Sequence, residues 1–245
     1  MRKVIAGIYL FWGLITFFGV MFCVLPFIVL SSFIPGRLGS IIPFTLLRIW
    51  AFVFSSLSLF FTAVYGREKV NSKGTYIYVS NHNSYLDSPA VVLASPNTFK
   101  PLGKIEMTKI PFFGFIYRRV VVLIDRSSKE SRNESVEKLK LVLKQGTSIL
   151  IFPEGTMNTG DEPVKDFYDG AFRIAIETQT PIAPFVIINA RKFLPRKNPF
   201  AIRPGIMRVY FSDVIDVTQY SLDDIETLKQ RVKSIMSEMI IKYQK

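Results

Sequence analysis

Two long apolar stretches open the chain, before the pattern of apolar and polar positions changes. Residues 4–30 and 41–65 are almost continuously apolar, and each is longer than the roughly 20 residues that a helix needs to cross a bilayer core. Turn-forming residues separate them at 35–40, so the pattern predicts a membrane-anchoring helical hairpin. A cleaved signal peptide is disfavoured because the first run is too long and a second follows closely. Two buried core helices are disfavoured because neither run has a polar face.

The charges around this hairpin indicate its orientation. The tip carries only Arg37, whereas basic residues flank both ends: Arg2, Lys3, Arg67 and Lys69. Because basic residues near membrane helices favour the cytoplasmic side, both ends are expected in the cytoplasm. Pro26 and Arg48 interrupt the apolar runs. A hairpin that dips into one leaflet, with Arg48 reaching the headgroups, therefore stays open beside a fully spanning one.

From about residue 75 short β-rich runs alternate with amphipathic helices, a pattern typical of an α/β domain. Strands are expected at 75–80, 120–124, 148–152, 182–188 and 207–211. Helices are expected at 88–94, 130–144, 170–178 and 221–243. The sequence thus predicts two parts: the membrane-anchoring hairpin over residues 1–66, and an α/β domain with a mixed sheet flanked by helices over residues 67–245. Between the third strand and the third helix, the polar loop 156–169 is long enough to suggest a functional role.

Composition narrows the range of partners. The chain has 31 Lys and Arg against 19 Asp and Glu, a formal net charge of +12. A basic excess beside apolar segments favours an anionic bilayer surface as partner. No nucleic acid is expected, because the sequence carries neither a known binding module nor a basic helix interleaved with aromatics. The single cysteine, Cys23, lies in the first apolar run, so no intramolecular disulfide is possible.

The only histidine, His82, directly follows the first expected strand of the α/β domain. Asp87 lies five positions later, where Ser88 and Pro89 favour a helix start. The two side chains therefore lie on a strand-to-helix loop, which allows them to meet. A carboxylate on one imidazole nitrogen fixes the tautomer that leaves the other nitrogen free to accept a proton. The pair is thus a candidate general base for activating a hydroxyl.

The same pair of residues also fits three other interpretations. A plain loop histidine next to a helix cap is the structural alternative. A metal site is disfavoured because the chain has no second histidine and no cysteine cluster. A serine hydrolase that uses Ser84 or Ser88 is disfavoured because the sequence has no Gly-x-Ser-x-Gly elbow.

Two further groups of polar residues follow expected strands. After the strand at 148–152, Pro153 ends the strand, Gly155 permits a sharp turn, and Glu154 and Thr156 offer polar contacts. Such edges of α/β sheets are where ligands bind. The strand at 120–124 ends on Asp125 and Arg126, and the guanidinium of Arg126 suits a phosphate, although a surface ion pair is an equal alternative.

Taken in chain order, these groups resemble the four motifs of the PlsC-type glycerolipid acyltransferases, which include the 1-acylglycerol-3-phosphate acyltransferases. The motifs are Asn81-His82-x4-Asp87, then Gly114 leading to Ile124-Asp125-Arg126, then Phe152-Pro153-Glu154-Gly155-Thr156, then Pro181-Ile182-Ala183-Pro184-Phe185-Val186. The resemblance covers roughly residues 75–190. The hairpin is similar to the membrane anchor of the bacterial members.

The resemblance implies a function and a role for each matched residue. The chain is expected to move a fatty acyl group onto the free hydroxyl of a lysolipid. The default acceptor is 1-acylglycerol-3-phosphate, which the reaction would convert to phosphatidate in phospholipid biosynthesis. His82 would be the general base and Asp87 its orienting carboxylate, and Pro184 would lie near the acyl donor. The residues implied to line the acceptor site are Arg126, Glu154, Gly155 and Thr156. Acyl-CoA or acyl carrier protein would be the donor, with no cofactor, at the cytoplasmic face of a bacterial inner membrane.

Two departures from the family pattern concern the acceptor. The third motif usually continues with Arg and Ser, but here the residues are Met157 and Asn158. A Lys usual before the Gly-Ala pair is also absent, since Tyr168 and Asp169 precede Gly170. Cations that could compensate are Lys104, Arg126, Lys165 and Arg173. Otherwise the acceptor would be a lysophospholipid or an amino-acid-containing lysolipid without a bare phosphate. From other classes, a non-catalytic membrane lipid-binding protein and a lipid esterase are the alternatives.

Overall fold

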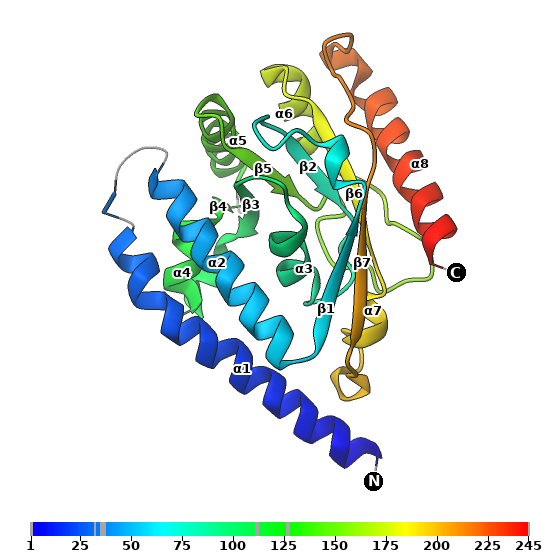
Figure 1. Cartoon of the computed structure of the whole chain (residues 1–245). Helices are drawn as coiled ribbons and strands as arrows, with labels where there is room; N and C mark the ends of the chain where they lie inside the picture. The colour runs from blue at the N-terminus through cyan, green and yellow to red at the C-terminus, as the bar shows by residue number, and fades with distance from the viewer. Residues whose placement is uncertain (1, 32, 35–37, 111–112, 126–127, 245) are drawn as a thin grey trace.

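The computed structural model describes residues 2–31, 33–34, 38–110, 113–125 and 128–244. Its strands form one seven-stranded mixed sheet in the order β1-β7-β6-β2-β5-β3-β4 (Figure 1). The strands β6, β2, β5, β3 and β4 run parallel to one another, β7 is antiparallel to β6, and β1 is parallel to β7. Their bounds are β1 Phe60–Tyr65, β2 Ile77–Ser80, β3 Phe99–Lys104, β4 Val122–Ile124, β5 Ser148–Ile151, β6 Ile182–Ile188 and β7 Gly205–Phe211. The expected mixed sheet is confirmed.

The central strands are buried on both faces. Every residue of β2, β5 and β6 is buried, as expected of parallel strands covered by helices on each side. Their continuous apolar runs explain why the sequence predicted them well. By contrast β3 was not predicted, because Pro101 and Gly103 interrupt its apolar pattern and both residues normally weaken a strand.

Helices form a layer on each face of the sheet (Figure 1). On one face lie α3 (Asp87–Ala94), α4 (Phe113–Val120) and the N-terminal helices, which share one apolar core. On the other lie α5 (Lys129–Lys144), α6 (Gly170–Thr178) and α8 (Ile225–Tyr243), which share a second core. The short helix α7 (Ala190–Phe193) follows β6. Four of these helices were predicted within a few residues, whereas α4 and α7 were not.

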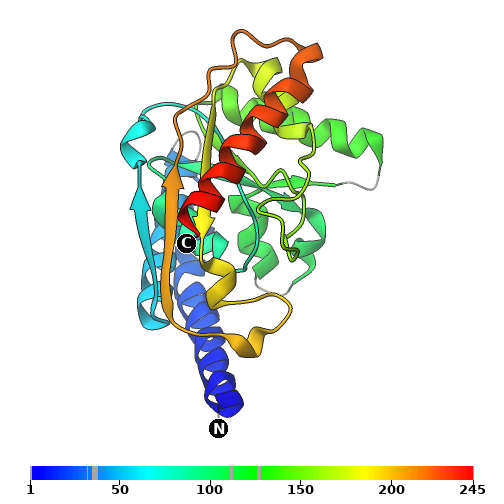
Figure 2. The same cartoon turned by 90° about the vertical axis from the view of Figure 1, so that its right-hand side faces the viewer.

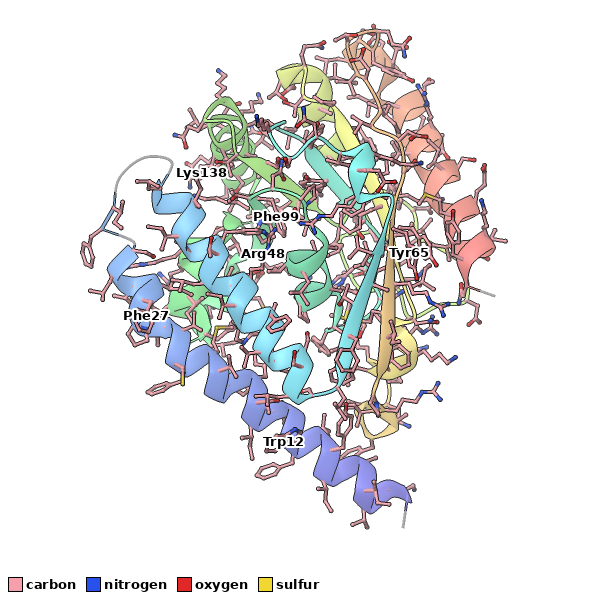
Figure 3. The ribbon with its side chains drawn as sticks, in the orientation of Figure 1. Trp12, Phe27, Arg48, Tyr65, Phe99 and Lys138 are labelled. Carbon is pink, nitrogen blue, oxygen red and sulfur yellow. The ribbon has the colours of Figure 1, made fainter. Side chains whose placement is uncertain are left out.

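The N-terminal hairpin consists of α1 (Arg2–Ser31) and α2 (Leu38–Leu57). By length and composition α1 could cross a membrane, while the apolar part of α2, 41–57, is shorter. Polar contacts join the two arms: the hydroxyls of Thr16 and Ser58 lie 2.7 Å apart, and the indole of Trp50 donates to the Phe17 carbonyl at 3.2 Å. On the outer side of α1 the apolar side chains are exposed, as Trp12 and Phe27 show in Figure 3.

The second apolar run is not one helix, and this corrects the sequence-based expectation. The helix ends at Leu57, the chain turns through Leu59 with a φ of 54°, and residues 60–65 form β1. All six residues of β1 pair with β7. The run Phe-Phe-Thr-Ala-Val-Tyr is as apolar as a membrane helix, but its aromatic and β-branched residues favour a strand. The expected boundary between hairpin and α/β domain, at residue 66, therefore assigns β1 to the hairpin although β1 belongs to the sheet. Apart from this strand, the division of the chain into two domains stays a prediction.

Arg48, whose contact with the lipid headgroups was one of two open alternatives, instead contacts the α/β domain. Its guanidinium donates to the carbonyls of Val92 at 3.3 Å and Ser95 at 2.6 Å, at the end of α3. Arg67 donates to the same Ser95 carbonyl at 2.9 Å. The last carbonyls of a helix have no partner within it and carry partial negative charge, so two cations stabilise them. Arg48 thus attaches α2 to the α/β domain.

The pairing of β1 with the sheet leads to a stability prediction. Phe60 is 1% exposed and packs against Tyr9 and Phe54, whereas its neighbour Phe61 is 49% exposed. We expect Phe60→Ala to lower the free energy of unfolding by about 3–5 kcal/mol, the usual cost of deleting a buried aromatic ring. Phe61→Ala is the matched control and should cost about 0.5 kcal/mol or less. Denaturant unfolding in mild detergent measures both, and equal costs would contradict the assignment of β1.

Candidate active site

The expected site residues gather at the edge of the sheet where the parallel strands end. The loop after β2 leads to α3 on one face, and the loop after the neighbouring β5 leads to α6 on the opposite face. Loops that diverge in this way open a crevice between two strands, which is where ligands bind in α/β sheets. Val79 of β2 pairs with Ile151 of β5, and His82 and Glu154 each lie three positions after these paired residues.

The histidine and the aspartate meet, as their spacing allowed. Nδ1 of His82 lies 2.8 Å from Oδ2 of Asp87. The same oxygen accepts the backbone N–H of Asn83 at 2.7 Å and of Ser84 at 2.8 Å. Asp87 is fully buried, so these three donors hold its carboxylate in one position. With Nδ1 bonded to the carboxylate, Nε2 is the nitrogen left to accept a proton.

The ring of Phe152 fixes the plane of the imidazole. The two rings stack with centroids 4.3 Å apart and an angle of 19° between them. The His82 side chain keeps 19% of its surface exposed, so part of it is open to solvent. In the sequence Phe152 was recognised only as part of a motif. Its contact with the histidine could not be predicted, because Phe152 follows β5, which is distant from His82 in the chain and a neighbour of β2 only in the folded sheet.

Glu154 holds the backbone on both sides of the crevice. Its side chain is buried, and Oε1 accepts the N–H of His82 at 2.8 Å while Oε2 accepts the N–H of Lys165 at 2.9 Å. Burial raises the pKa of this carboxyl above its ordinary value, and the two backbone N–H groups oppose that rise. Both oxygens accept backbone N–H groups, so Glu154 connects the loop after β2 to the loop after β5.

Two asparagines hold the histidine loop in ways that the sequence did not reveal. Asn81 donates to the Ile187 carbonyl at 3.0 Å and accepts the Ile187 N–H at 2.7 Å, which continues the pairing of β2 with β6 beyond Ser80. Asn158, at the position where the family pattern usually has Ser, donates its backbone N–H to the His82 carbonyl at 2.6 Å. The only signal for Asn81 was its place next to the histidine in the first motif.

The residues expected to bind the acceptor are only partly brought together. Gly155 has a φ of 66°, which glycine tolerates best, and Thr156 and Lys165 are exposed. Nζ of Lys165 donates to the Thr156 hydroxyl at 2.9 Å. Lys104 is exposed at the end of β3 on the same sheet edge, opposite Ile124. Arg126 lies outside the described residues.

The positions that depart from the family pattern supply no cation to this part of the site. Asp169 pairs instead with Lys229 on α8 at 2.8 Å, and Tyr168 is exposed. Among the described residues, no group of three or more His, Cys, Asp or Glu side chains could hold a metal ion.

Comparison with known proteins gives matches over most of the chain. Residues 62–188 match the family described as Acyltransferase. A 1-acyl-sn-glycerol-3-phosphate acyltransferase of Escherichia coli K12 is 32% identical over 177 residues, which cover 71% of this chain and 70% of that protein. The chloroplastic enzyme BAT2 of Brassica napus, with the same activity in its name, is 30% identical over 66% of this chain. The chain spans only 47% of BAT2 and 62% of the similarly named acl-2 of Caenorhabditis elegans.

One solved structure shares the whole fold. The crystal structure of PlsC from Thermotoga maritima, an acyltransferase for 1-acyl-sn-glycerophosphate, matches 99% of this chain and 97% of its own, with a TM-score of 0.81 and 22% identity. At that identity the match establishes the fold, including the N-terminal hairpin.

The position of Glu154 leads to a second stability prediction. Glu154→Gln leaves one oxygen but puts an NH2 group against one of the two backbone N–H donors, and two donors cannot bond to each other. We expect the free energy of unfolding to fall by about 1–3 kcal/mol, the cost of a buried unpaired polar group. Glu162→Gln, an exposed site on the same loop, is the control and should change it by about 0.5 kcal/mol or less. Equal unfolding midpoints would show that Glu154 does not hold the two loops.

Proposed function

The chain belongs to the Acyltransferase family, and we propose that it transfers a fatty acyl group from a thioester to the free hydroxyl of a lysolipid. The default acceptor is 1-acylglycerol-3-phosphate, which would yield phosphatidate. The observation that carries this proposal is the contact between His82 and the buried Asp87 at the crevice of the sheet. The names of the E. coli and B. napus relatives support the choice of acceptor.

The proposed reaction is one nucleophilic substitution at the thioester carbonyl. Nε2 of His82 takes the proton of the lysolipid hydroxyl while the hydroxyl oxygen attacks the carbonyl carbon. The new carbon–oxygen bond forms, the carbon–sulfur bond breaks, and the leaving thiolate receives the proton that His82 holds. Asp87 stabilises the imidazolium between these two steps. No acyl group is bound covalently to the protein.

The substrates would meet at a membrane surface. The exposed apolar side of α1 suits contact with lipid, and the net charge of +12 favours an anionic bilayer. The proposed donor is acyl-CoA or acyl carrier protein, which places the crevice at the cytoplasmic face. The orientation of the hairpin and the bacterial inner membrane as location stay predictions.

Two alternatives from other classes have less support. A lipid esterase would need a nucleophile, but Ser84 is buried and its hydroxyl donates to the Leu194 carbonyl and accepts the Leu86 N–H. A non-catalytic lipid-binding protein would have no use for a histidine whose tautomer is fixed by a buried carboxylate. Within the acyltransferases, a lysophospholipid or an amino-acid-containing lysolipid is favoured as acceptor by the two missing cations, at Met157 and at Tyr168.

Replacement of the proposed base tests the reaction. His82→Ala should lower kcat by about 10²- to 10⁴-fold, the usual contribution of a general base. Folding should persist, because the bonds from His82 to Glu154 and Asn158 use backbone atoms. Asp87→Asn should have a similar or milder effect, and Tyr85→Phe, an exposed change on the same loop, should have none. Turnover of a labelled acyl thioester by purified, folded protein measures all three; a His82→Ala variant as active as wild type would refute the mechanism.

A second set of variants identifies the acceptor. If lysophosphatidate is the native acceptor, Lys165→Ala or Arg126→Ala should raise its KM by roughly 10- to 100-fold, the effect of losing a charge-assisted contact to phosphate. Met157→Arg should then bring little gain. If the native acceptor lacks a phosphate monoester, Met157→Arg should instead improve lysophosphatidate use and harm the native reaction. Kinetics on a panel of lysolipids decide between them, with Lys138→Ala on α5 as a distant control.

A further inference from the structure

A cavity of about 730 Å³ lies beside the histidine loop, on the β6 side of it. Its walls come from the ends of β2 and β6, from α7 and the chain after it, from the loop 158–163 and from the C-terminal end of α8. Figure 2 shows α7 and the end of α8 close together. A smaller hollow of about 100 Å³ shares Asn83 and Arg191 with it. The crevice mechanism described above assigns no role to this cavity.

The walls carry an excess of positive charge. Five cations line the two hollows: Arg191, Lys192, Arg196, Lys197 and Arg203. The only carboxylates in the walls are Asp161 and Glu162, and in the part of the chain that the structure describes none of the five cations forms an ion pair. Like charges gathered around a concave surface repel one another, and an anion that enters it is attracted by all of them.

Two of these cations are held in place by the protein backbone. The guanidinium of Arg191 donates to the carbonyls of Gly160 and Thr159, and Nε of Arg203 donates to the Lys192 carbonyl at 3.0 Å. Arginine held in this way loses less side-chain freedom when it binds a phosphate. Both arginines are therefore held at the wall of the hollow, and guanidinium groups suit phosphate as a ligand.

We propose that this cavity binds the phosphate groups of coenzyme A when the chain takes acyl-CoA as donor; the inference rests on the proposed acyl transfer. Asn81 and Asn83, which flank His82, form part of the wall. The nucleotide can therefore occupy the cavity while the thioester reaches the imidazole.

The lining favours the donor over the other phosphate-bearing substrate. A lysolipid has an acyl tail that needs an apolar wall, whereas this cavity is lined mainly by amide and charged side chains. Coenzyme A carries three phosphates, which matches several cations better than the single phosphate of lysophosphatidate does. The volume lies in the usual range of small-molecule sites, about 300–1,000 Å³.

The test is a double variant on the cavity wall with a matched control. Lys192→Gln/Arg203→Gln removes two of the cations, and Lys73→Gln/Lys138→Gln removes two exposed lysines far from the cavity, before β2 and on α5. We expect the cavity variant to raise the KM for acyl-CoA about tenfold or more, with kcat and the KM for the lysolipid unchanged. The control should match wild type. An unchanged KM for acyl-CoA, or a raised KM for the lysolipid alone, would overturn the assignment.

Truncated and carrier-bound donors separate phosphate binding from other effects. With an acyl-pantetheine donor, which has no phosphate, the cavity variant and the wild type should have equal KM. An equal loss with acyl-pantetheine would mean that the substitutions disturb the site in general, and a loss larger with acyl carrier protein than with acyl-CoA would assign the cavity to the carrier. Either result overturns the proposal.

A direct measurement of coenzyme A binding tests the cavity separately from the proposed acyl transfer. Titration of free coenzyme A into the purified full-length protein in detergent needs no turnover. We expect wild-type and control protein to bind coenzyme A and the cavity variant to bind it about tenfold more weakly or worse, with unchanged thermal unfolding. Binding of this kind in a protein without acyl transfer would refute the proposed function and leave the site standing. Acyl transfer from acyl-CoA without such a difference in binding would refute the site.

Discussion

The carboxylate of Glu154 ties together the two loops on which the whole site depends. Parallel strands end in backbone groups that the sheet no longer pairs, and at the crevice between β2 and β5 the two loops leave toward opposite faces. One buried carboxylate accepts an N–H from each loop, at His82 and at Lys165. A buried acceptor must be satisfied, so the distance between the loops is set by the span of one carboxyl group. The stacking of Phe152 on the imidazole follows from that spacing.

The short helix α3 connects this site to the membrane hairpin. Its first residue, Asp87, orients His82, and the carbonyls at its other end accept the guanidinium of Arg48 from α2. A single helix of eight residues, Asp87–Ala94, therefore connects the proposed catalytic pair to the contact with α2. A charged side chain such as Arg48 costs free energy in an apolar helix. Its hydrogen bonds to the C-terminal end of α3 offset that cost. The hairpin is thus part of the packing that fixes the orientation of the crevice, as well as an attachment to lipid.

The sequence predicted the features that are local and missed those that depend on distant segments. His82 and Asp87 lie five positions apart on one loop, so their meeting needed only a strand before them and a helix after them. The central strands were predicted from their uninterrupted apolar runs. In contrast β1 has the composition of a membrane helix, and only its pairing with β7 identifies it as a strand. The basic cavity is built from segments far apart in the chain, and the scattered cations of 191–203 carried no recognisable motif.

Positive charge is distributed unevenly on the two sides of His82. The proposed reaction explains this difference, because its two substrates differ in charge. On the β5 side, where the acceptor is expected, Met157 and Tyr168 stand where the family pattern usually has cations, and Lys165 is the cation that contacts the motif. On the β6 side Arg191, Lys192 and Arg203 line a cavity, and Arg196 and Lys197 line the smaller hollow beside it. Acyl transfer needs two substrates that reach one nitrogen from different directions, one drawn from the bilayer and one from water. A lipid gains most of its binding energy from its apolar chain, whereas a soluble, multiply charged donor depends on electrostatic attraction. The side of the site that is rich in cations is therefore the side from which a water-soluble thioester would approach.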